Sequence, residues 1–309
     1  MRKLISIITP CLNEEGNVQE LYERISKVME SQSYDYEIIY IDNCSNDQTV
    51  NILRTMAAKD KRIKVIVNTR NFGQVRSPYH ALMQAKGDVV IAMASDLQDP
   101  PEKIPEFIRK WEEGNKVVIG VKTGSKESGL FYLLRSLYYR VLRNLSEVPL
   151  IDNFTGFGLY DRQVVEILRE FDDPYPYFRG QIAEIGFDIA RIEFNQPRRK
   201  RGITKNNFYT LYDLAMLGVV SYTKIPLRLA TMVGFLAGIV SFVVGMIYLV
   251  YKLIDWQNFS LGSAPVVIGL FFLGSVQLFF LGIVGEYIAQ IHTHSVHRPL
   301  VVEKERINF

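Results

Sequence analysis

Cysteine is scarce in this chain of 309 residues, and so is any excess of one charge. The two cysteines, Cys11 and Cys44, are too few for a disulfide framework and favour a reducing, cytoplasm-facing compartment. Lysine and arginine total 36 against 33 for aspartate and glutamate, without the large basic excess that is typical of a dedicated nucleic-acid-binding protein. We therefore expect no nucleic-acid partner.

The glycine-rich nucleotide motifs are also missing. Neither G-x-G-x-x-G nor G-x-x-x-x-G-K-[ST] occurs in the sequence, which argues against a dinucleotide-binding or a P-loop protein. The apolar run near the N-terminus is too short for a signal peptide and has no small-residue cleavage site, so we expect residues 4–9 to form a first strand.

Charge is absent from two long C-terminal stretches, Leu229–Tyr251 and Trp256–Gly285. Roughly 20 apolar residues span a bilayer core, so we predict transmembrane helices near 227–252 and 263–288. Glycines within both stretches suit close helix packing and favour a homo-oligomer. The alternative, two buried helices of a soluble core, is disfavoured because soluble cores seldom hold two such stretches in succession.

The connection between the two spans, 252–262, is short, so the spans are expected to form a hairpin whose two ends share one side of the membrane. Basic residues flank the hairpin at both ends, namely Lys205, Lys224, Arg228, Arg298, Lys304 and Arg306. The positive-inside rule then places both termini in the cytoplasm. Residues 206–222 are predicted to form an interfacial helix, or else an amphipathic helix packed on the domain.

Strand and helix patterns alternate before the hairpin. Apolar, β-branched runs predict strands at 4–9, 36–41, 63–67, 88–93 and 116–121. Helical patterns occupy 15–31, 47–60, 74–86, 102–113 and 127–146. This alternation predicts a parallel α/β sheet with right-handed crossovers. We expect a catalytic domain over 1–200, a juxtamembrane loop and interfacial helix over 201–225, two spans over 226–290 and a cytoplasmic tail over 291–309.

Polar loops follow four of the predicted strands, at residues 9–15, 42–47, 68–74 and 93–101. The carboxyl ends of parallel strands meet at one sheet edge, where α/β proteins bind nucleotides. A diphosphate bound there would need a cation as a bridge, and Mg²⁺ or Mn²⁺ prefers oxygen ligands. The alternative is ordinary helix capping, by Ser45 or Asn46 for one helix and by Asp99 for another.

Four stretches of these loops resemble family 2 glycosyltransferases: IITPCLNEEGNVQEL, IDNCSNDQT, NFGQ and MASDLQDPPE. The two apolar spans extend the resemblance to the polyprenyl-phosphate glycosyltransferases, the group that includes dolichol-phosphate mannose synthases and bactoprenol glucosyltransferases. The resemblance covers nearly the whole chain. It implies a GT-A fold with a Rossmann-like, mostly parallel sheet, a nucleotide-sugar donor, a divalent metal and inverting transfer to a lipid phosphate.

The resemblance also implies the site residues. The donor would be bound by Pro10, Asn13, Glu14, Asp42, Gln74, Ser95 and Asp96. Asp42 would hydrogen-bond the base. Ala94 stands where the family motif D-x-D has its first aspartate, so the metal, Mg²⁺ or Mn²⁺, would be held by Asp96 and Gln98 alone.

A lipid phosphate is a nucleophile at neutral pH, because its second pKa lies near 6, and it needs positive charge rather than a general base. The candidates for binding it or the diphosphate are Lys122, Lys126, Arg135, Arg140, Arg201 and Lys205. We expect catalysis to rest on Asp96, Lys122 and Arg135. Arg140 could equally be a solvated helix charge, and Arg201 with Lys205 a basic patch that attracts anionic lipid.

The expected reaction is transfer of a hexose, glucose from UDP-glucose in the favoured version, to undecaprenyl phosphate. GDP-mannose, UDP-N-acetylglucosamine and UDP-aminoarabinose are alternative donors. A polysaccharide synthase is a rival enzyme, but two spans are too few for a conduit and no Q-x-x-R-W motif is present. An inactive scaffold subunit for glycolipid transport is the non-enzyme alternative, motivated by Ala94.

Overall fold

The computed structural model describes residues 2–123, 151, 154–197, 208–254, 263–296 and 298–309. They form two compact units. The first unit comprises Met1–Leu211 together with Val296–Phe309, and the second comprises Tyr212–Ser295. The helix predicted at 127–146 lies outside the described residues.

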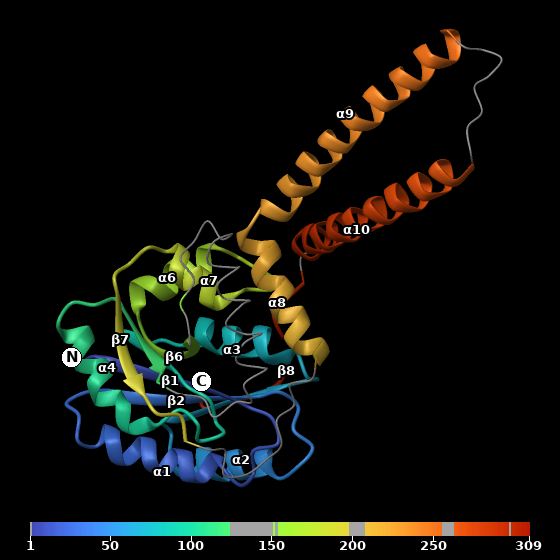
Figure 1. The fold of residues 1–309 in the computed structure, drawn as a ribbon. Coiled ribbons are helices and arrows are strands. Elements are labelled where there is room, and N and C mark those ends of the chain that lie inside the picture. The colour runs from blue at the N-terminus through green and yellow to red at the C-terminus, as the bar shows by residue number, and fades with distance from the viewer. Residues whose placement is uncertain (1, 124–150, 152–153, 198–207, 255–262, 297) are drawn as a thin grey trace. The chain divides into compact units, whose positions relative to one another are not determined.

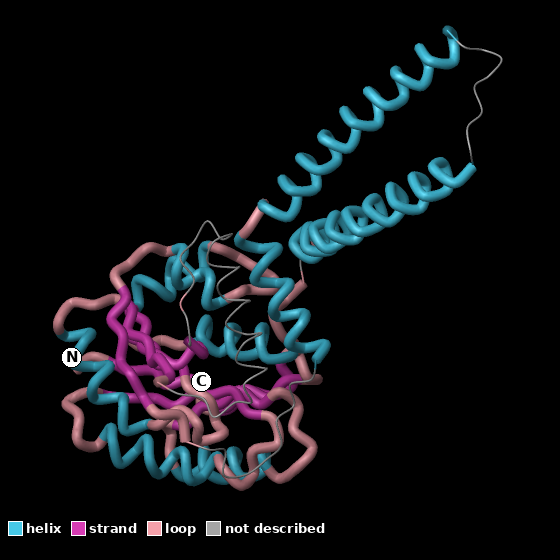
Figure 2. Tube along the Cα trace, in the orientation of Figure 1, coloured by secondary structure: helices cyan, strands magenta, loops and turns pink. Residues whose placement is uncertain are grey.

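An eight-stranded sheet forms the centre of the first unit, in the order β7-β5-β6-β4-β1-β2-β3-β8 (Figures 1 and 2). The strands are β1 (Leu4–Cys11), β2 (Asp35–Asp42), β3 (Ile63–Asn68), β4 (Val89–Ala92), β5 (Val117–Lys122), β6 (Phe154–Asp161), β7 (Ile189–Phe194) and β8 (Glu303–Ile307). Parallel pairing joins β1 to β2 and β4, β2 to β3, and β5 to β7. The predicted GT-A-like sheet is confirmed. The sequence did not predict the antiparallel strands β6 and β8, nor β7, which pairs parallel to β5.

Helices cover both faces of this sheet (Figure 1). One face carries α1 (Val18–Met29), α2 (Thr49–Lys59) and α4 (Ile104–Glu112), and the other carries α3 (Gly73–Gln84), α6 (Arg162–Glu170) and α7 (Phe178–Glu184). A short 3-10 helix, η1 (Pro101–Lys103), precedes α4. Side chains alternate along a strand, so β1 sends Ile5 and Ile7 into one core and Ile8 into the other.

The strand order reverses beside β1. The chain builds β1, β2 and β3 in one direction and then crosses to place β4 on the opposite side of β1. Such a reversal leaves a crevice outside the carboxyl ends of the two strands, which is where open α/β sheets bind ligands. The fold therefore places the candidate site at the carboxyl ends of β1 and β4.

The C-terminal residues form an edge strand of the same sheet. β8 runs antiparallel to β3, from the pair Val65 and Ile307 to the pair Asn68 and Glu303, with an irregularity in register after Val67. The sequence predicts only a tail over 291–309. The return of the chain to the sheet shows that the segment following the hairpin belongs to the first unit.

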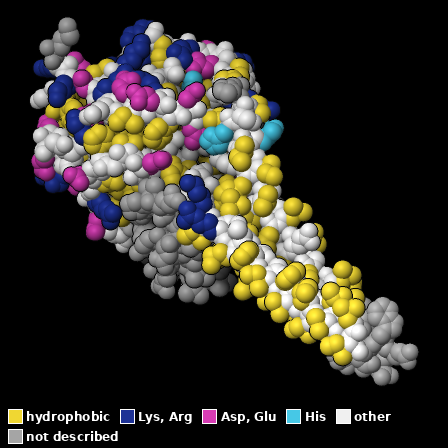
Figure 3. All heavy atoms as spheres, turned by 90° about the horizontal axis from the view of Figure 1, so that it is seen from above, with side chains coloured by type: hydrophobic (Ala, Val, Ile, Leu, Met, Phe, Trp, Pro, Cys, Tyr) yellow, Lys and Arg dark blue, Asp and Glu magenta, His cyan; other side chains and the backbone are white. Residues whose placement is uncertain are grey.

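The second unit consists of α8 (Phe208–Tyr222), α9 (Ile225–Ile254) and α10 (Ser263–Ser295). Within it, Ile225–Val250 and Gly269–Ser295 are long and apolar enough to cross a membrane, and their most apolar windows are not buried. Phe235 and Phe271 are each 72% exposed, and hydrophobic side chains cover the visible face of this unit in Figure 3. Exposed apolar surface on this scale does not fit a soluble core. The helix predicted at 206–222 is present as α8, and its place at a membrane interface stays a prediction.

Candidate functional site

The four predicted polar loops follow β1, β2, β3 and β4 in the structure. Because β1 lies between β2 and β4, and β3 lies beyond β2, the four loops occupy one edge of the sheet. The expectation that they meet at the carboxyl ends of parallel strands is confirmed. We call them loop 1 (residues 12–17), loop 2 (43–48), loop 3 (69–72) and loop 4 (93–99).

Ser45 holds loop 1 and loop 2 together. Its hydroxyl oxygen accepts a hydrogen bond from the backbone N–H of Asn13 at 2.8 Å, and the hydroxyl donates to Asp42 Oδ1 at 2.5 Å. In return, the side-chain oxygen of Asn13 accepts from the backbone N–H of Asn46 at 2.8 Å. Asn13 has a φ of 56°, a left-handed conformation that asparagine tolerates better than most residues. The two loops are thus fixed to each other before any ligand binds.

Asp42 lies at the end of β2 and is fully buried. Burial raises the pKa of its carboxyl group, although the hydrogen bonds from the Ser45 hydroxyl and the Ser45 backbone N–H lower it in part. Glu14 in loop 1 is also buried, and its backbone N–H donates to Thr49 Oγ1 at 2.8 Å. The sequence predicted Asp42, Asn13 and Glu14 as neighbours, and loops 1 and 2 bring them together.

The capping alternatives for the same residues are wrong. α2 begins at Thr49 with Gln48 at its N-cap, so Ser45 and Asn46 stand outside the helix. η1 has Pro100 at its N-cap without a side-chain hydrogen bond, and Asp99 instead accepts from the backbone N–H of Ala94 at 2.9 Å. These polar side chains therefore shape the loops rather than starting helices.

Asn43 joins loop 2 to loop 3. Its side-chain oxygen accepts from the backbone N–H of Phe72 at 2.8 Å, and its amide nitrogen donates to Asn71 Oδ1 at 2.8 Å. Asn68 donates to the same Asn43 oxygen at 3.3 Å and to Ser77 Oγ at 3.0 Å. Sequence reasoning missed the role of Asn43. The signal available was its position directly after the buried strand residue Asp42.

Loop 4 alternates between buried and partly exposed residues. Ser95, Leu97 and Asp99 are buried, whereas Asp96 and Gln98 are half-buried. The Ser95 hydroxyl donates to the backbone carbonyl of Pro10 at 2.7 Å, which fastens loop 4 to β1. Leu97 has a φ of 62°, and the backbone N–H of Gln98 donates to Asp96 Oδ1 at 3.1 Å. The tight turn leaves the predicted metal ligands on its accessible side.

Asp96 and Gln98 fit a partial metal site. Among the residues that the structure describes, no group of three or more His, Cys, Asp or Glu side chains could hold a metal ion. The Gln98 amide nitrogen donates to the backbone carbonyl of Pro197 at 3.4 Å, which leaves the amide oxygen as the atom for a cation. Mg²⁺ is commonly bound through one or two carboxylates, with substrate phosphates and water completing its shell. The donor set therefore suits a cation that arrives with a diphosphate.

Lys122, the last residue of β5, belongs to the same edge of the fold. Burial raises the pKa of Asp99 to about 7, against the lowering effects of the Ala94 N–H and the Lys122 charge, while the charge of Asp96 raises it further. Lys122 and Asp96 thus both act electrostatically on Asp99. The role of Lys122 in binding phosphate stays a prediction.

The remaining predicted site residues divide into two groups. Gln74 is exposed at the start of α3 and has no demonstrated link to loop 4. The others lie outside the described residues, namely Lys126, Arg135, Arg140, Arg201 and Lys205. Their roles stay predictions.

Comparison with known proteins assigns the chain to a family. The model of Glycosyl transferase family 2 matches residues 6–169, and that of the GtrB C-terminal hairpin matches residues 225–291. The uncharacterized glycosyltransferase YkcC of Bacillus subtilis strain 168 is 33% identical over 96% of this chain and 92% of its own length. The bactoprenol glucosyl transferase of Shigella phage SfV is 32% identical over 97% of this chain and 98% of its own. The SfII prophage-derived bactoprenol glucosyl transferase of Shigella flexneri is 31% identical, over 97% of each chain. The chain thus belongs to glycosyl transferase family 2 and carries the C-terminal hairpin named for GtrB.

Proposed function

We propose that this protein transfers a hexose from a nucleotide-sugar, with UDP-glucose as the favoured donor, to polyprenyl phosphate with inversion at the sugar. One observation carries the proposal: the similarity to bactoprenol glucosyl transferases runs through both the loops and the hairpin, over 97% of the chain. An enzyme that acts on a lipid phosphate needs a donor site and a membrane segment. Both are present in one chain.

The donor side rests on loops 1, 2 and 4. Asp42 accepts a hydrogen bond from the base, and Pro10, Asn13 and Glu14 form the wall beside it. Asp96 and the Gln98 oxygen hold Mg²⁺ or Mn²⁺, which supplies positive charge for the departing diphosphate. Ser95 keeps these ligands in place through its bond to Pro10.

The acceptor side rests on positive charge. The phosphate of the lipid is already ionised near pH 7, so the protein must hold it close to the sugar rather than remove a proton from it. Lys122 is the candidate for this role within the described residues, and the effect of its charge on Asp99 of loop 4 supports the assignment. Lys126, Arg135, Arg140, Arg201 and Lys205 complete the proposed set of phosphate-binding residues.

The hairpin anchors the enzyme in the cytoplasmic membrane. The chain leaves the first unit before α9 and returns to it after α10, since Val296–Phe309 belongs to that unit. A folded unit occupies one side of a bilayer, so both ends of the hairpin must be on that side. Lys224, Arg228 and Arg298 flank the spans, and the positive-inside rule makes that side the cytoplasm.

A homo-oligomer is part of the same proposal. At Gly234, Gly238 and Gly245 of α9, an added Cβ would meet nothing within 4 Å in the described chain. Small residues allow close contact between helices in a membrane. We propose that a second copy of the hairpin packs against this face of α9.

Asp42→Asn tests the donor site. The amide keeps the shape of the side chain but replaces one of the two oxygens that accept from Ser45 with a donor. We expect the KM for the nucleotide-sugar to rise by about tenfold, the effect of losing one hydrogen bond to a charged group. Asp35→Asn, at the opposite end of β2, is the matched control and should leave this KM unchanged. An unchanged KM in Asp42→Asn would remove Asp42 from the donor site.

A panel of labelled donors tests the function itself. Membranes containing the protein are incubated with undecaprenyl phosphate and, separately, UDP-glucose, GDP-mannose, UDP-N-acetylglucosamine or UDP-aminoarabinose. Lipid-phase label from UDP-glucose alone, in a product with one sugar per lipid, is the expected result. Label from another nucleotide-sugar would show that the protein transfers a different sugar from the one we propose. A polymer would favour a polysaccharide synthase, and no label from any donor would favour the scaffold.

A further inference from the structure

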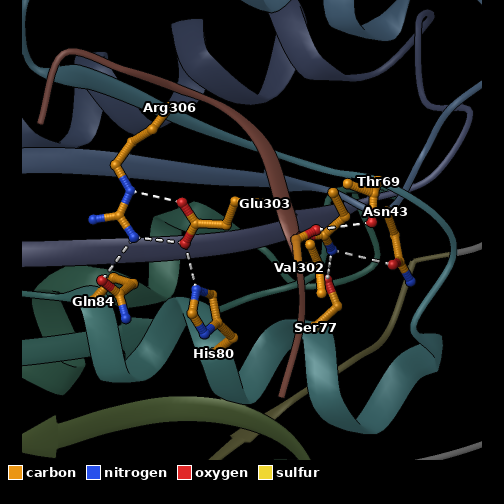
Figure 4. A network of polar contacts seen from close by, with 9 residues as sticks. Asn43, Thr69, Ser77, His80, Gln84, Val302, Glu303 and Arg306 are labelled. Atoms are coloured by element: carbon orange, nitrogen blue, oxygen red, sulfur yellow. Dashed lines mark hydrogen bonds and ion pairs between the residues drawn. The ribbon is translucent and has the colours of Figure 1, made fainter. Parts of the chain in front are cut away.

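The segment that follows the hairpin reaches the loops of the donor site. Beyond α10, residues 298–309 run along the edge of the sheet and form β8 beside β3. The carbonyl of Val302, directly before β8, accepts two hydrogen bonds from Thr69 in loop 3, from its backbone N–H at 2.9 Å and from its hydroxyl at 3.1 Å (Figure 4). One carbonyl of the C-terminal segment therefore fixes the first residue of loop 3.

Several anchors hold this segment in place independently of Thr69. Glu303 accepts from Arg306 at 2.5 and 2.8 Å and lies 2.6 Å from His80 Nε2 on α3, while Arg306 also donates to Gln84 at 3.0 Å (Figure 4). At the far end, Arg54 of α2 pairs with Glu305 at 2.5 Å. Val302 thus belongs to a segment that is bonded to both α3 and α2, so its carbonyl is held in a fixed position for loop 3.

Loop 3 connects Val302 to loops 1 and 2 of the proposed donor site. Thr69 begins the loop, and Phe72 and Asn71 at its other end bond to Asn43 of loop 2. Asn43 follows Asp42 directly, and Asp42 bonds to Ser45, which in turn accepts from Asn13 of loop 1. Hydrogen bonds and short stretches of backbone therefore lead from Val302 to the groups that would surround the base.

The register of β8 supports the same connection. Asn68 pairs with Glu303, whereas Val67 pairs with Glu305, so one residue of β8 is extra at this point. Such a bulge bends the strand that carries it, and bulges are frequent next to active sites. Here the bend occurs opposite Asn68, whose side chain bonds to Asn43 and Ser77.

We infer that the C-terminal segment positions the donor site, with Thr69 as the positioning residue that links Val302 to loop 3. Without this link, loop 3 would keep its hydrogen bonds to Asn43 and the bond from the Cys44 thiol to the Thr69 carbonyl, and Asp42 would lose part of the support for its orientation toward the base. The inference rests on the proposed function in one respect, namely that the ligand of loops 1 to 3 is a nucleoside diphosphate sugar.

Three full-length variants test the inference. Thr69→Val removes the hydroxyl donor and keeps the shape, and Thr69→Ser keeps the hydroxyl. Glu305→Gln weakens the pair with Arg54 at the other end of the segment, away from loop 3. Two quantities are measured on the protein in lipid nanodiscs: KM and kcat for UDP-glucose, and amide hydrogen exchange at Thr69, Phe72 and Gly73.

Thr69→Val should raise the donor KM about threefold to tenfold, the effect of one lost hydrogen bond, and leave kcat nearly unchanged. Its loop 3 amides should exchange faster. Thr69→Ser should match the wild type in both measurements. Glu305→Gln should lower the Tm without changing the donor KM. A donor KM for Thr69→Val equal to that of the wild type would overturn the inference.

The two proposals can fail separately. If the wild type uses no nucleotide-sugar at all, the proposed function fails, and hydrogen exchange decides the inference. Faster exchange at Phe72 and Gly73 in Thr69→Val, with wild-type exchange in Thr69→Ser, would then support the link between the C-terminal segment and loop 3. Equal exchange in the wild type, Thr69→Val and Thr69→Ser would refute the inference.

Discussion

Asp96→Ala is expected to lower the rate of sugar transfer by at least about a thousandfold, because metal stabilisation of a leaving group is worth several kcal/mol and each 1.4 kcal/mol is a factor of ten. Ala94 already replaces one carboxylate of the family motif, so Asp96 is the single acidic ligand in the proposed set. Ser95 and Gln98 cannot supply its charge. The loss should appear in kcat with saturating UDP-glucose and Mn²⁺, measured as lipid-phase label.

The control for this variant is Asp88→Ala. Asp88 directly precedes β4, whereas Asp96 lies in loop 4 after the strand, so the control removes a carboxylate at the other end of β4. Asp88 accepts from the backbone N–H of Leu4 at 2.7 Å, so its loss should cost some stability but little activity. Membrane insertion should be normal in both variants. Turnover near that of the wild type in Asp96→Ala would refute the metal role that we assign to this residue.

Lys122→Met is expected to reduce kcat/KM for polyprenyl phosphate by about a hundredfold. Truncating one partner of a desolvated charge pair costs about 2–5 kcal/mol, and Lys122 is half-buried at the end of β5. The methionine keeps most of the length of the side chain and removes only the charge. Binding of UDP by calorimetry should change little, because the donor rests on loops 1, 2 and 4.

Lys116→Met is the matched control, since Lys116 directly precedes β5 and Lys122 ends it. Lys116 pairs with Asp161 at 3.3 Å, so this variant should lower the Tm and leave kcat/KM for the lipid unchanged. If Lys122→Met lowered the affinity for UDP and left kcat/KM for polyprenyl phosphate unchanged, Lys122 would belong to the donor site instead.

Much of the fold could be predicted because its central strands have a simple signal. β1, β2, β3 and β4 are buried on both faces, so each reads as a continuous apolar run, as is typical of parallel strands. The two apolar spans were equally clear. The helices between the strands followed from their periodicity.

β8 could not be predicted in this way. Its sequence, EKERI, is mostly charged, and its residues alternate between half-buried and exposed. What holds it are pairs with residues far away in the chain, such as Arg54 with Glu305 and His80 with Glu303. A local pattern does not contain such partners. The same holds for β6, which enters the sheet antiparallel between β4 and β5.

The site was predicted where single residues follow buried strands, as Asp42 and Asp96 do. Asn43 and Thr69 were missed because their importance lies in what they connect rather than in what they could bind. Ser45 was considered only as a helix cap, yet it bonds to Asp42 and Asn13. The sequence motif thus indicated the ligand, and the structure adds the hydrogen bonds that hold the motif in shape.

Removal of divalent cations tests the central claim most directly. The purified full-length protein is placed in nanodiscs with undecaprenyl phosphate and the donor that it uses, and transfer is measured after EDTA treatment and again after Mg²⁺ or Mn²⁺ is restored. The account predicts that transfer stops with EDTA and returns with the metal. Transfer at the full rate with every divalent ion removed would contradict it.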